Sequence, residues 1–180
     1  MANYIDNIRL LKEITPYAQA CRVAKENNTI MPRIPEYVGG DIKKIAEHIA
    51  TKGNFANYSW IEEMIEDGIE NCILYLHNFD ERTSNNPFGY ISLIITRAFI
   101  RRIDKEKRSQ YVRFKMLQKS FVTMQLNEEV FVSSRKEHDP DYVSAFIQDY
   151  ETKMGIKKEK ISEKKRIKEE SYGLSISSII

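Results

Sequence analysis

Apolar side chains recur at three- and four-residue intervals between residues 59 and 76, and this spacing most constrains the fold. The stripe consists of Ile61, Met64, Ile65, Ile69, Cys72, Ile73 and Leu76. Ser59 and Glu62 form a capping-box pattern at its start, which predicts where the helix begins. A helix that is apolar on one side has to be buried against other elements. The neighbouring segments repeat the helical pattern, so we predict an all-α fold.

Helices are also predicted on the N-terminal side of this stripe. Residues 3–28 have helical spacing, with a break expected at Thr15 and Pro16 because proline interrupts helices. The segment 31–35 is expected to be extended, because a residue before proline avoids the helical region. Gly39 and Gly40 then open a short amphipathic helix, which we expect to end at Gly53.

Two further helices are predicted on the C-terminal side. Asn86 and Pro87 start the first, with asparagine as the cap and proline in the first turn. It is expected to run to about Arg108, or as far as Lys119. Its predicted buried face consists of Phe88, Ile91, Ile95, Ala98 and Phe99. The second helix starts at residues 139–140 and is expected to end near Gly155. Residues 128–134 fit either a short strand or a helix end.

Composition excludes several classes of protein. Hydrophobic residues make up 42% of the 180 residues, too many for a disordered chain, and no apolar run is long enough for a membrane span. The N-terminus lacks a secretory signal, and Cys21 and Cys72 cannot form a disulfide framework, so we expect a cytoplasmic protein. Four segments are predicted: 1–53, helical; 54–120, the central domain; 121–155, an additional helical segment; and 156–180, a charged tether or solvated helix with an apolar tail.

The charges are separated along the chain, although the net charge is only +2. Between Asn54 and Arg82 there are seven acids and one base, a local net charge of −6. Between Ile100 and Lys119 there are eight bases and two acids, a local net charge of +6. Two successive helices are therefore predicted to carry surfaces of opposite sign.

The acidic helix places Glu62, Glu66 and Glu70 four residues apart. Each such like-charge pair destabilises a helix by about 0.2–0.5 kcal/mol. The acidic side is therefore either a solvated face or a docking surface for a basic partner.

The basic helix places Arg97, Arg101, Lys105 and Arg108 in one sector, with Tyr90 in the same sector two turns earlier. Cations suit phosphates, and aromatic rings suit unpaired bases. This pattern fits a nucleic-acid surface, and it also fits a solvated amphipathic helix.

The sequence contains no residue pattern that is typical of a catalytic or metal-binding site. His48, His77 and His138 are scattered, and no spacing of ligands for a metal is present. No glycine-rich phosphate loop or nucleophile elbow occurs. We therefore expect no enzyme activity, no catalytic residues, no metal and no cofactor.

The segment E-M-I-E-D-G-I-E-N-C-I-L-Y-L-H-N-F-D, residues 63–80, resembles the second conserved region of the sigma-70 family of bacterial transcription initiation factors. The following helix, P-F-G-Y-I-S-L-I-I-T-R-A-F-I-R-R-I, is similar to the aromatic-rich promoter helix of that family. More narrowly, the chain resembles the late sigma factors of T-even-like bacteriophages. The supporting segments are N-F-x-x-Y, L-H-N-F-D, N-P-x-x-Y-I and F-I-Q-D-Y-x-x-K-M.

The resemblance implies a domain like sigma-70 region 2 at 54–120, with a role for each charged surface. It implies that the acidic helix docks on the β′ clamp helices of a bacterial RNA polymerase core, through Glu63, Glu66, Asp67, Glu70 and Ile73. It implies that the basic helix captures an AT-rich minus-ten-like element of promoter DNA, through Tyr90, Arg97, Arg101 and Arg102, with Phe88 as a base-stacking residue. Lys105 and Arg108, from the basic sector of the same helix, complete the predicted DNA-binding residues. Leu93 and Ile94 stand where the family has a tryptophan pair, and no helix-turn-helix domain for an upstream element follows residue 120.

Late phage sigma factors also bind the replication sliding clamp through a hydrophobic C-terminal motif. The uncharged tail is similar in character, which implies clamp binding by Tyr172, Leu174, Ile176, Ile179 and Ile180; the alternative is a tail that packs on its own domain. The expected protein is a late sigma factor in the cytoplasm of an infected cell, associated with DNA and served by a possible co-activator. The runner-up is a non-sigma DNA-binding adaptor tethered to the clamp.

Overall fold

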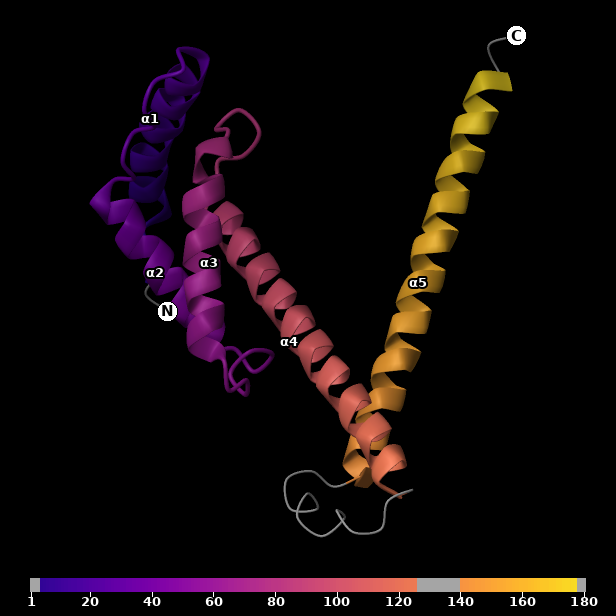
Figure 1. Ribbon diagram of the computed structural model, residues 1–180. Helices are drawn as coiled ribbons and strands as arrows, with labels where there is room; N and C mark the ends of the chain where they lie inside the picture. The colour runs from indigo at the N-terminus through magenta and orange to yellow at the C-terminus, as the bar shows by residue number, and fades with distance from the viewer. Residues whose placement is uncertain (1–3, 126–139, 178–180) are drawn as a thin grey trace. The chain divides into compact units, whose positions relative to one another are not determined.

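The computed structural model describes residues 4–125 and 140–177, and the regular structure in these ranges is helical (Figure 1). The elements are α1 (Asn7–Glu26), α2 (Glu36–Ala50), α3 (Ile61–Tyr75), the 3-10 helix η1 (Leu76–Asn78), α4 (Pro87–Gln125) and α5 (Pro140–Ser177). No strand occurs in the described ranges, which confirms the prediction of an all-α fold. Residues 128–134, predicted as a strand or a helix end, lie outside the described residues.

The chain divides into two compact units. The N-terminal unit (Met1–Lys105) contains α1, α2, α3, η1 and the first half of α4, and the C-terminal unit (Glu106–Ile180) contains the rest of α4 and α5. The four segments predicted from the sequence stay a prediction.

α1 runs without interruption through Pro16, so the predicted break is wrong. Proline removes one backbone donor, which leaves the carbonyl of Lys12 without its helical partner. Lys12 and Pro16 both have exposed side chains, so this carbonyl lies on a side of the helix that water can reach. The helix starts after Asp6, whose carboxylate accepts hydrogen bonds from two backbone N–H groups of the first turn, each at 3.1 Å.

α2 begins at Glu36, so Gly39 and Gly40 lie inside the helix and do not open it as predicted. Proline has a fixed backbone angle that suits a helix start, and Pro35 occupies the N-cap. Val38, in the first turn, is fully buried and fixes this turn on the core. The segment before it, 31–35, has no regular structure, in agreement with the extended conformation expected there.

α3 begins at Ile61, and the predicted capping box of Ser59 and Glu62 is not formed. The N-cap residue is Trp60, and no side-chain hydrogen bond caps the helix. Trp60 packs on the core and against Tyr58, with 5.3 Å between ring centroids. Trp60, partly buried against the core, takes the N-cap position, and Ser59 lies one residue outside it.

The stripe of α3 faces the core of the N-terminal unit, as predicted, with one exception. Met64, Cys72 and Leu76 are fully buried, and burial raises the pKa of the Cys72 thiol to about 12. Ile73 is the exception, because 52% of this residue is exposed. The core also receives Phe79, which follows η1, and side chains from the other helices of the unit: Leu10, Ile14, Cys21, Val38, Ile42, Ile45, Ile49, Ile91, Ile95 and Phe99.

α3 and α4 approach each other closely at Gly68. A Cβ atom at this position would lie 2.9 Å from Cε1 of Phe99 and 3.1 Å from Cγ2 of Ile95. Both of these side chains are fully buried and have little room to move. Gly68 costs helix stability, since glycine is about 1 kcal/mol less favourable than alanine in a helix interior. Its missing side chain allows the backbone of α3 to pack directly on the side chains of α4.

α4 starts as predicted and continues further than predicted. The Asn86 side chain accepts a hydrogen bond from the backbone N–H of Gly89 at 3.0 Å, with Pro87 as the first helical residue. Of the predicted buried face, four residues are buried and Phe88 is half-buried. The helix passes both expected ends and reaches Gln125. The added length carries Phe114, which packs with α5 and so extends the helix into the C-terminal unit.

α5 also passes its expected end, because Gly155 lies inside the helix. A Cβ atom at Gly155 would meet nothing within 4 Å, so this glycine marks neither a cap nor a close contact. The segment after it, 156–170, is helical, which favours the solvated helix over the linker. Among the described side chains of the C-terminal unit, the buried core consists of Phe114 of α4 with Val143 and Ile147 of α5.

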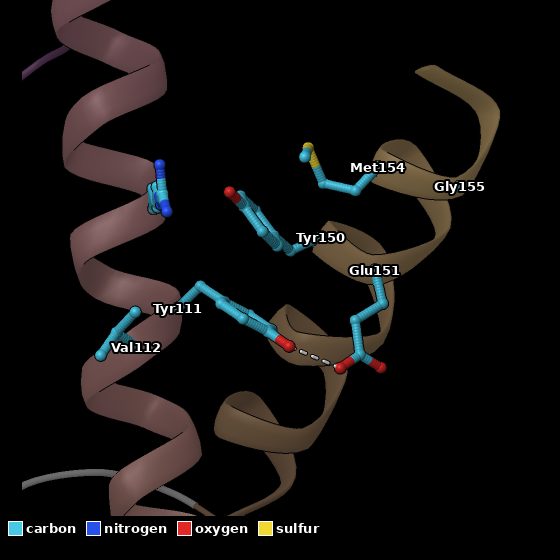
Figure 2. A pocket seen from close by; sticks show the side chains of 7 residues that line it. Tyr111, Val112, Tyr150, Glu151, Met154 and Gly155 are labelled. Carbon is cyan, nitrogen blue, oxygen red and sulfur yellow. Dashed lines mark hydrogen bonds between the residues drawn. The ribbon is translucent and has the colours of Figure 1, made fainter. Parts of the chain in front are cut away.

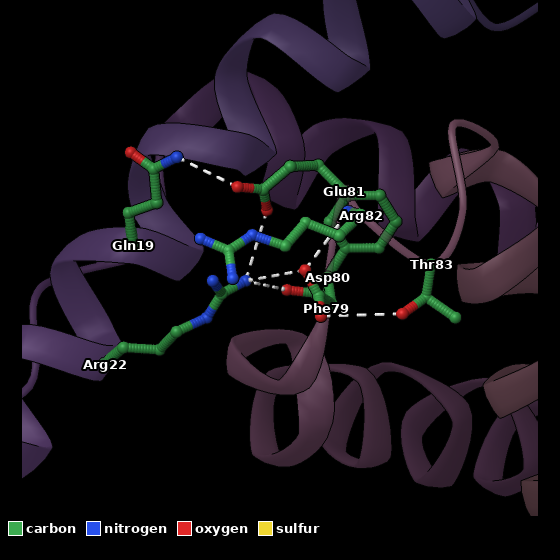
Figure 3. Close-up of polar contacts among 7 residues, drawn as sticks. All are labelled: Gln19, Arg22, Phe79, Asp80, Glu81, Arg82 and Thr83. Atoms are coloured by element: carbon green, nitrogen blue, oxygen red, sulfur yellow. Dashed lines mark hydrogen bonds and ion pairs between the residues drawn. The ribbon is translucent and has the colours of Figure 1, made fainter.

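A polar cluster connects α1 to the loop that follows η1 (Figure 3). Arg22 Nη2 donates to the carbonyl oxygen of Phe79 at 2.9 Å and to Glu81 Oε2 at 3.2 Å, and it lies 3.6 Å from Asp80 Oδ1. Gln19 Nε2 donates to Glu81 Oε1 at 3.0 Å, and this hydrogen bond is the main cause that lowers the pKa of Glu81. The loop between α3 and α4 is thereby fixed from α1. Sequence reasoning missed Arg22, because nothing local marks its partner almost sixty residues away.

Candidate nucleic-acid and protein-binding surfaces

The acidic surface of α3 is formed by side chains that point away from the core. Glu63, Glu66 and Glu70 are exposed, and none of them makes an ion pair with a residue in the described part of the chain. Glu62, four residues before Glu66, is exposed as well. The like-charge spacing costs helix stability, and the helix N-terminus offsets part of this cost for Glu62 and Glu63, which lie in the first turn.

An apolar patch continues this surface at the C-terminal end of α3. Ile73 and Leu74 follow Glu70 by three and four residues, so they lie on the same side of the helix, and each is about half exposed. Exposed side chains of this size in a row are unusual on a helix whose other apolar residues are buried. Acids followed by exposed apolar residues give α3 the chemistry of a protein-binding face.

Asp67 lies apart from the other acids, because it faces α4. Its Oδ2 atom is 3.2 Å from Arg102 Nη1, and both side chains are partly buried. Next to this pair, Arg101 Nη2 donates to Asn71 Oδ1, and Asn71 Nδ2 donates to the carbonyl oxygen of Asp67 at 2.6 Å. One residue predicted to bind polymerase and two predicted to bind DNA thus connect α3 to α4.

Tyr90, in the first turn of α4, lies at the end of the interface with α3. Its hydroxyl donates to the carbonyl oxygen of Tyr75 at 2.9 Å, and its ring packs on Phe79 with 5.4 Å between centroids. Burial raises the pKa of Tyr90. One edge of Tyr90 still reaches the surface, where it lines a pocket of about 290 Å³.

This pocket, the α3–α4 pocket, combines aromatic, apolar and cationic side chains. It is lined by Tyr75, Asn78, Tyr90, Leu93, Ile94, Arg97 and Arg101. Arg97 is exposed and makes no hydrogen bond or ion pair with a described residue. Leu93 is 48% exposed and supplies an apolar wall. A planar group with a neighbouring negative charge matches this combination of side chains.

The structure brings three of the predicted DNA-binding residues together in the α3–α4 pocket: Tyr90, Arg97 and Arg101. Phe88 lies elsewhere. Its ring packs edge-on against Tyr4 with 5.9 Å between centroids, and its backbone N–H donates to Asn7 Oδ1 at 3.2 Å. Phe88 therefore acts as a contact between the start of α4 and the N-terminal end of the unit.

The remaining predicted DNA-binding residues lie further along α4. Lys105 is exposed at the end of the N-terminal unit, and Arg108 is exposed in the C-terminal unit. Among the predicted clamp-binding residues, the side chains of Tyr172, Leu174 and Ile176, and all of Ile179 and Ile180, lie outside the described part of the chain. Clamp binding stays a prediction.

Sequence reasoning missed the wall of the α3–α4 pocket that Tyr75 and Asn78 form. Tyr75 is an aromatic residue outside the apolar stripe of α3. That departure from the helical period was the one sign in the sequence that Tyr75 contributes to a second surface. Leu93 and Ile94 were marked by the sequence as departures from the tryptophan pair. Their position in the pocket follows only from the packing of α4 on α3.

In residues 4–125 and 140–177, no group of three or more acidic, histidine or cysteine side chains could hold a metal ion. No helix in those ranges is long and apolar enough to cross a lipid bilayer.

Comparisons with known proteins give no further assignment: no model of a protein family matches the chain, and no curated protein matches its sequence.

Proposed function

We propose that the protein is a phage-type late transcription sigma factor, with a region 2-like domain that binds the host RNA polymerase core and directs it to AT-rich, minus-ten-like promoters. The acidic surface of α3, with Glu63, Glu66 and Glu70, binds the polymerase. The α3–α4 pocket, with Tyr90 and Arg97, binds promoter DNA.

One observation carries the proposal: an unpaired acidic face and a cationic, aromatic pocket lie on two helices that pack directly on each other. The pairing of Asp67 with Arg102 and the close approach at Gly68 fix the two helices as one body. A protein with this arrangement can hold a basic protein surface and an anionic polymer at the same time. The resemblance of residues 63–103 to the sigma-70 family supports the same division of roles.

Charge reversal on α3 tests the polymerase-binding role. The variant Glu63→Lys/Glu66→Lys changes two exposed acids that pair with no described residue, so the fold should be unaffected. The matched control is Glu47→Lys, an exposed acid on α2 whose weak ion pair with Lys43 spans 3.9 Å. We expect the double variant to bind core polymerase about tenfold more weakly or worse, because like charges then meet across the interface. Binding equal to that of the control would reject this role.

Removing one cation from the pocket tests the DNA-binding role separately. Arg97→Gln should leave affinity for core polymerase unchanged and reduce promoter-specific binding of the complex, because a phosphate contact is lost. Its matched control is Arg33→Gln, an exposed arginine outside α4. Equal promoter binding by the two variants would contradict the assignment of the pocket.

A further inference from the structure

A second cleft, of about 640 Å³, opens within the C-terminal unit between α4 and α5 (Figure 2). We call it the aromatic cleft. Tyr111 and Val112 line it from α4, and Tyr150 and Met154 line it from α5. In Figure 2, the side chains of Tyr150 and Met154 extend from α5 toward α4. Val112 is 43% exposed there, although it is apolar.

The floor of the cleft is a fixed aromatic platform. The rings of Tyr111 and Tyr150 are stacked, with 4.5 Å between centroids and 22° between planes. The Tyr111 hydroxyl donates to Glu151 Oε1 at 2.7 Å, and Lys115 Nζ lies 2.8 Å from the same oxygen. The platform is therefore held in place before any ligand arrives, which lowers the entropy cost of binding.

The negative charge of Glu151 is compensated inside the cleft. The hydrogen bond from Lys115, followed by the one from Tyr111, holds the pKa of Glu151 below its ordinary value. Arg108 also lines the cleft and adds a positive charge. The one acid in the lining is thus paired, and an anionic ligand meets no uncompensated carboxylate.

The two helices beside the cleft are basic. Residues 106–119 of α4 and 149–160 of α5 together carry nine lysines and arginines and four acids. A second copy of this chain that docked cleft to cleft would bring the same positive charge, so self-association of this symmetric kind is disfavoured. An anionic polymer neutralises the excess, and aromatic rings beside cations are the combination that holds unpaired bases.

We propose that the aromatic cleft binds single-stranded nucleic acid, with an unpaired base stacked on Tyr150 and a neighbouring phosphate at Arg108. This inference rests on the proposed function only for the identity of the ligand as nucleic acid. The site is separate from the α3–α4 pocket, because all its lining residues belong to the C-terminal unit. Duplex DNA, whose bases are already stacked, binds the cleft more weakly than a single strand does.

Substitution of the platform tests this site in the full-length protein. The measurement is fluorescence anisotropy of a labelled single strand of about twelve nucleotides, within the range of known site sizes. Tyr150→Leu should weaken binding between about fivefold and about a hundredfold, the range expected for loss of one base–aromatic stack. Tyr150→Phe keeps the ring and should bind as the unchanged protein does. The control Tyr142→Leu alters a 54% exposed tyrosine of α5 outside the cleft.

Photocrosslinking identifies where the single strand binds, which is necessary because the α3–α4 pocket is also proposed to bind DNA. A single strand that carries iodouracil should crosslink to the peptide that contains Tyr150 or to the one that contains Tyr111. Crosslinks confined to the N-terminal unit would overturn the proposal, as would equal binding by Tyr150→Leu and Tyr142→Leu. Capture of poly-glutamate by the cleft without capture of the single strand would also overturn it and would assign an acidic protein segment instead. Loss of polymerase binding in the charge-reversal test leaves all these results unaffected, so the two proposals fail separately.

Discussion

Replacement of Gly68 by alanine tests the close packing of α3 on α4, on which both proposed surfaces depend. The added Cβ atom would lie 2.9 Å from Phe99 and 3.1 Å from Ile95, and both are fully buried. Overpacking of this kind costs about 1–3 kcal/mol, and the higher helix propensity of alanine returns about 1 kcal/mol. We therefore expect Gly68→Ala to lower the free energy of unfolding by about 0–2 kcal/mol, and Gly68→Val to lower it by about 3 kcal/mol or more.

The matched control is Gly40→Ala in α2, where an added Cβ atom meets nothing within 4 Å. The same substitution should there stabilise the protein by about 0.5–1 kcal/mol, because only the propensity gain remains. Urea unfolding followed by tryptophan fluorescence reports this unit selectively, since Trp60 is the single tryptophan and packs on its core. If Gly68→Ala stabilised the protein as much as Gly40→Ala does, the close approach of α3 to α4 would be refuted.

Three further predictions follow from other contacts. A double-mutant cycle of Asp67→Asn and Arg102→Gln should give a coupling energy of about 0.5–1.5 kcal/mol in urea unfolding, since the pair is partly buried; additive effects would show that the two residues do not interact. The pKa of Glu151 is lowered in the folded state, so its contribution to stability is present above the ordinary glutamate pKa and is lost as the pH falls below it. Glu151→Gln should therefore make the stability of the C-terminal unit less sensitive to acid. Thermal unfolding from pH 7 to about pH 3 measures this effect. The Cys72 thiol, with a pKa of about 12, should resist alkylation by iodoacetamide at pH 8 and react rapidly in urea, and equal rates would mean that the core is open.

Helix type could be predicted from the sequence, and helix ends largely could not. The spacing of apolar residues in α3 and α4 reflects which side of each helix is buried, so the pattern was sufficient there. The effect of Pro16 was predicted wrongly, because the free-energy cost of proline inside α1 depends on whether water reaches the carbonyl of Lys12. Access of water to that carbonyl is a property of the folded surface. The start of α3 was misplaced by one residue, because Trp60, which packs on the core, takes the N-cap position instead of Ser59. Tertiary contacts help to decide where a helix begins and ends, and capping or proline patterns in the sequence account for only part of that choice.

The candidate surfaces were predictable in charge and not in geometry. Opposite charges on successive helices are visible in the sequence, and so are the individual residues of each surface. The pairing of Asp67 with Arg102 was not predictable, because the two are separated by 35 residues and meet only when α4 crosses α3. The same crossing joins Tyr75 to Tyr90 and so creates the α3–α4 pocket. The aromatic cleft likewise needs α5 to return along α4, which brings Tyr150 onto Tyr111.

Run-off transcription with purified bacterial core polymerase tests the proposed function most directly. The template carries an AT-rich minus-ten-like element, and the full chain is the added factor. The account predicts transcripts with a defined start, which decrease with Glu63→Lys/Glu66→Lys and with Arg97→Gln but not with Glu47→Lys. Transcription no greater than that of core polymerase alone, with DNA binding intact, would contradict it and would favour a DNA-binding adaptor without sigma activity.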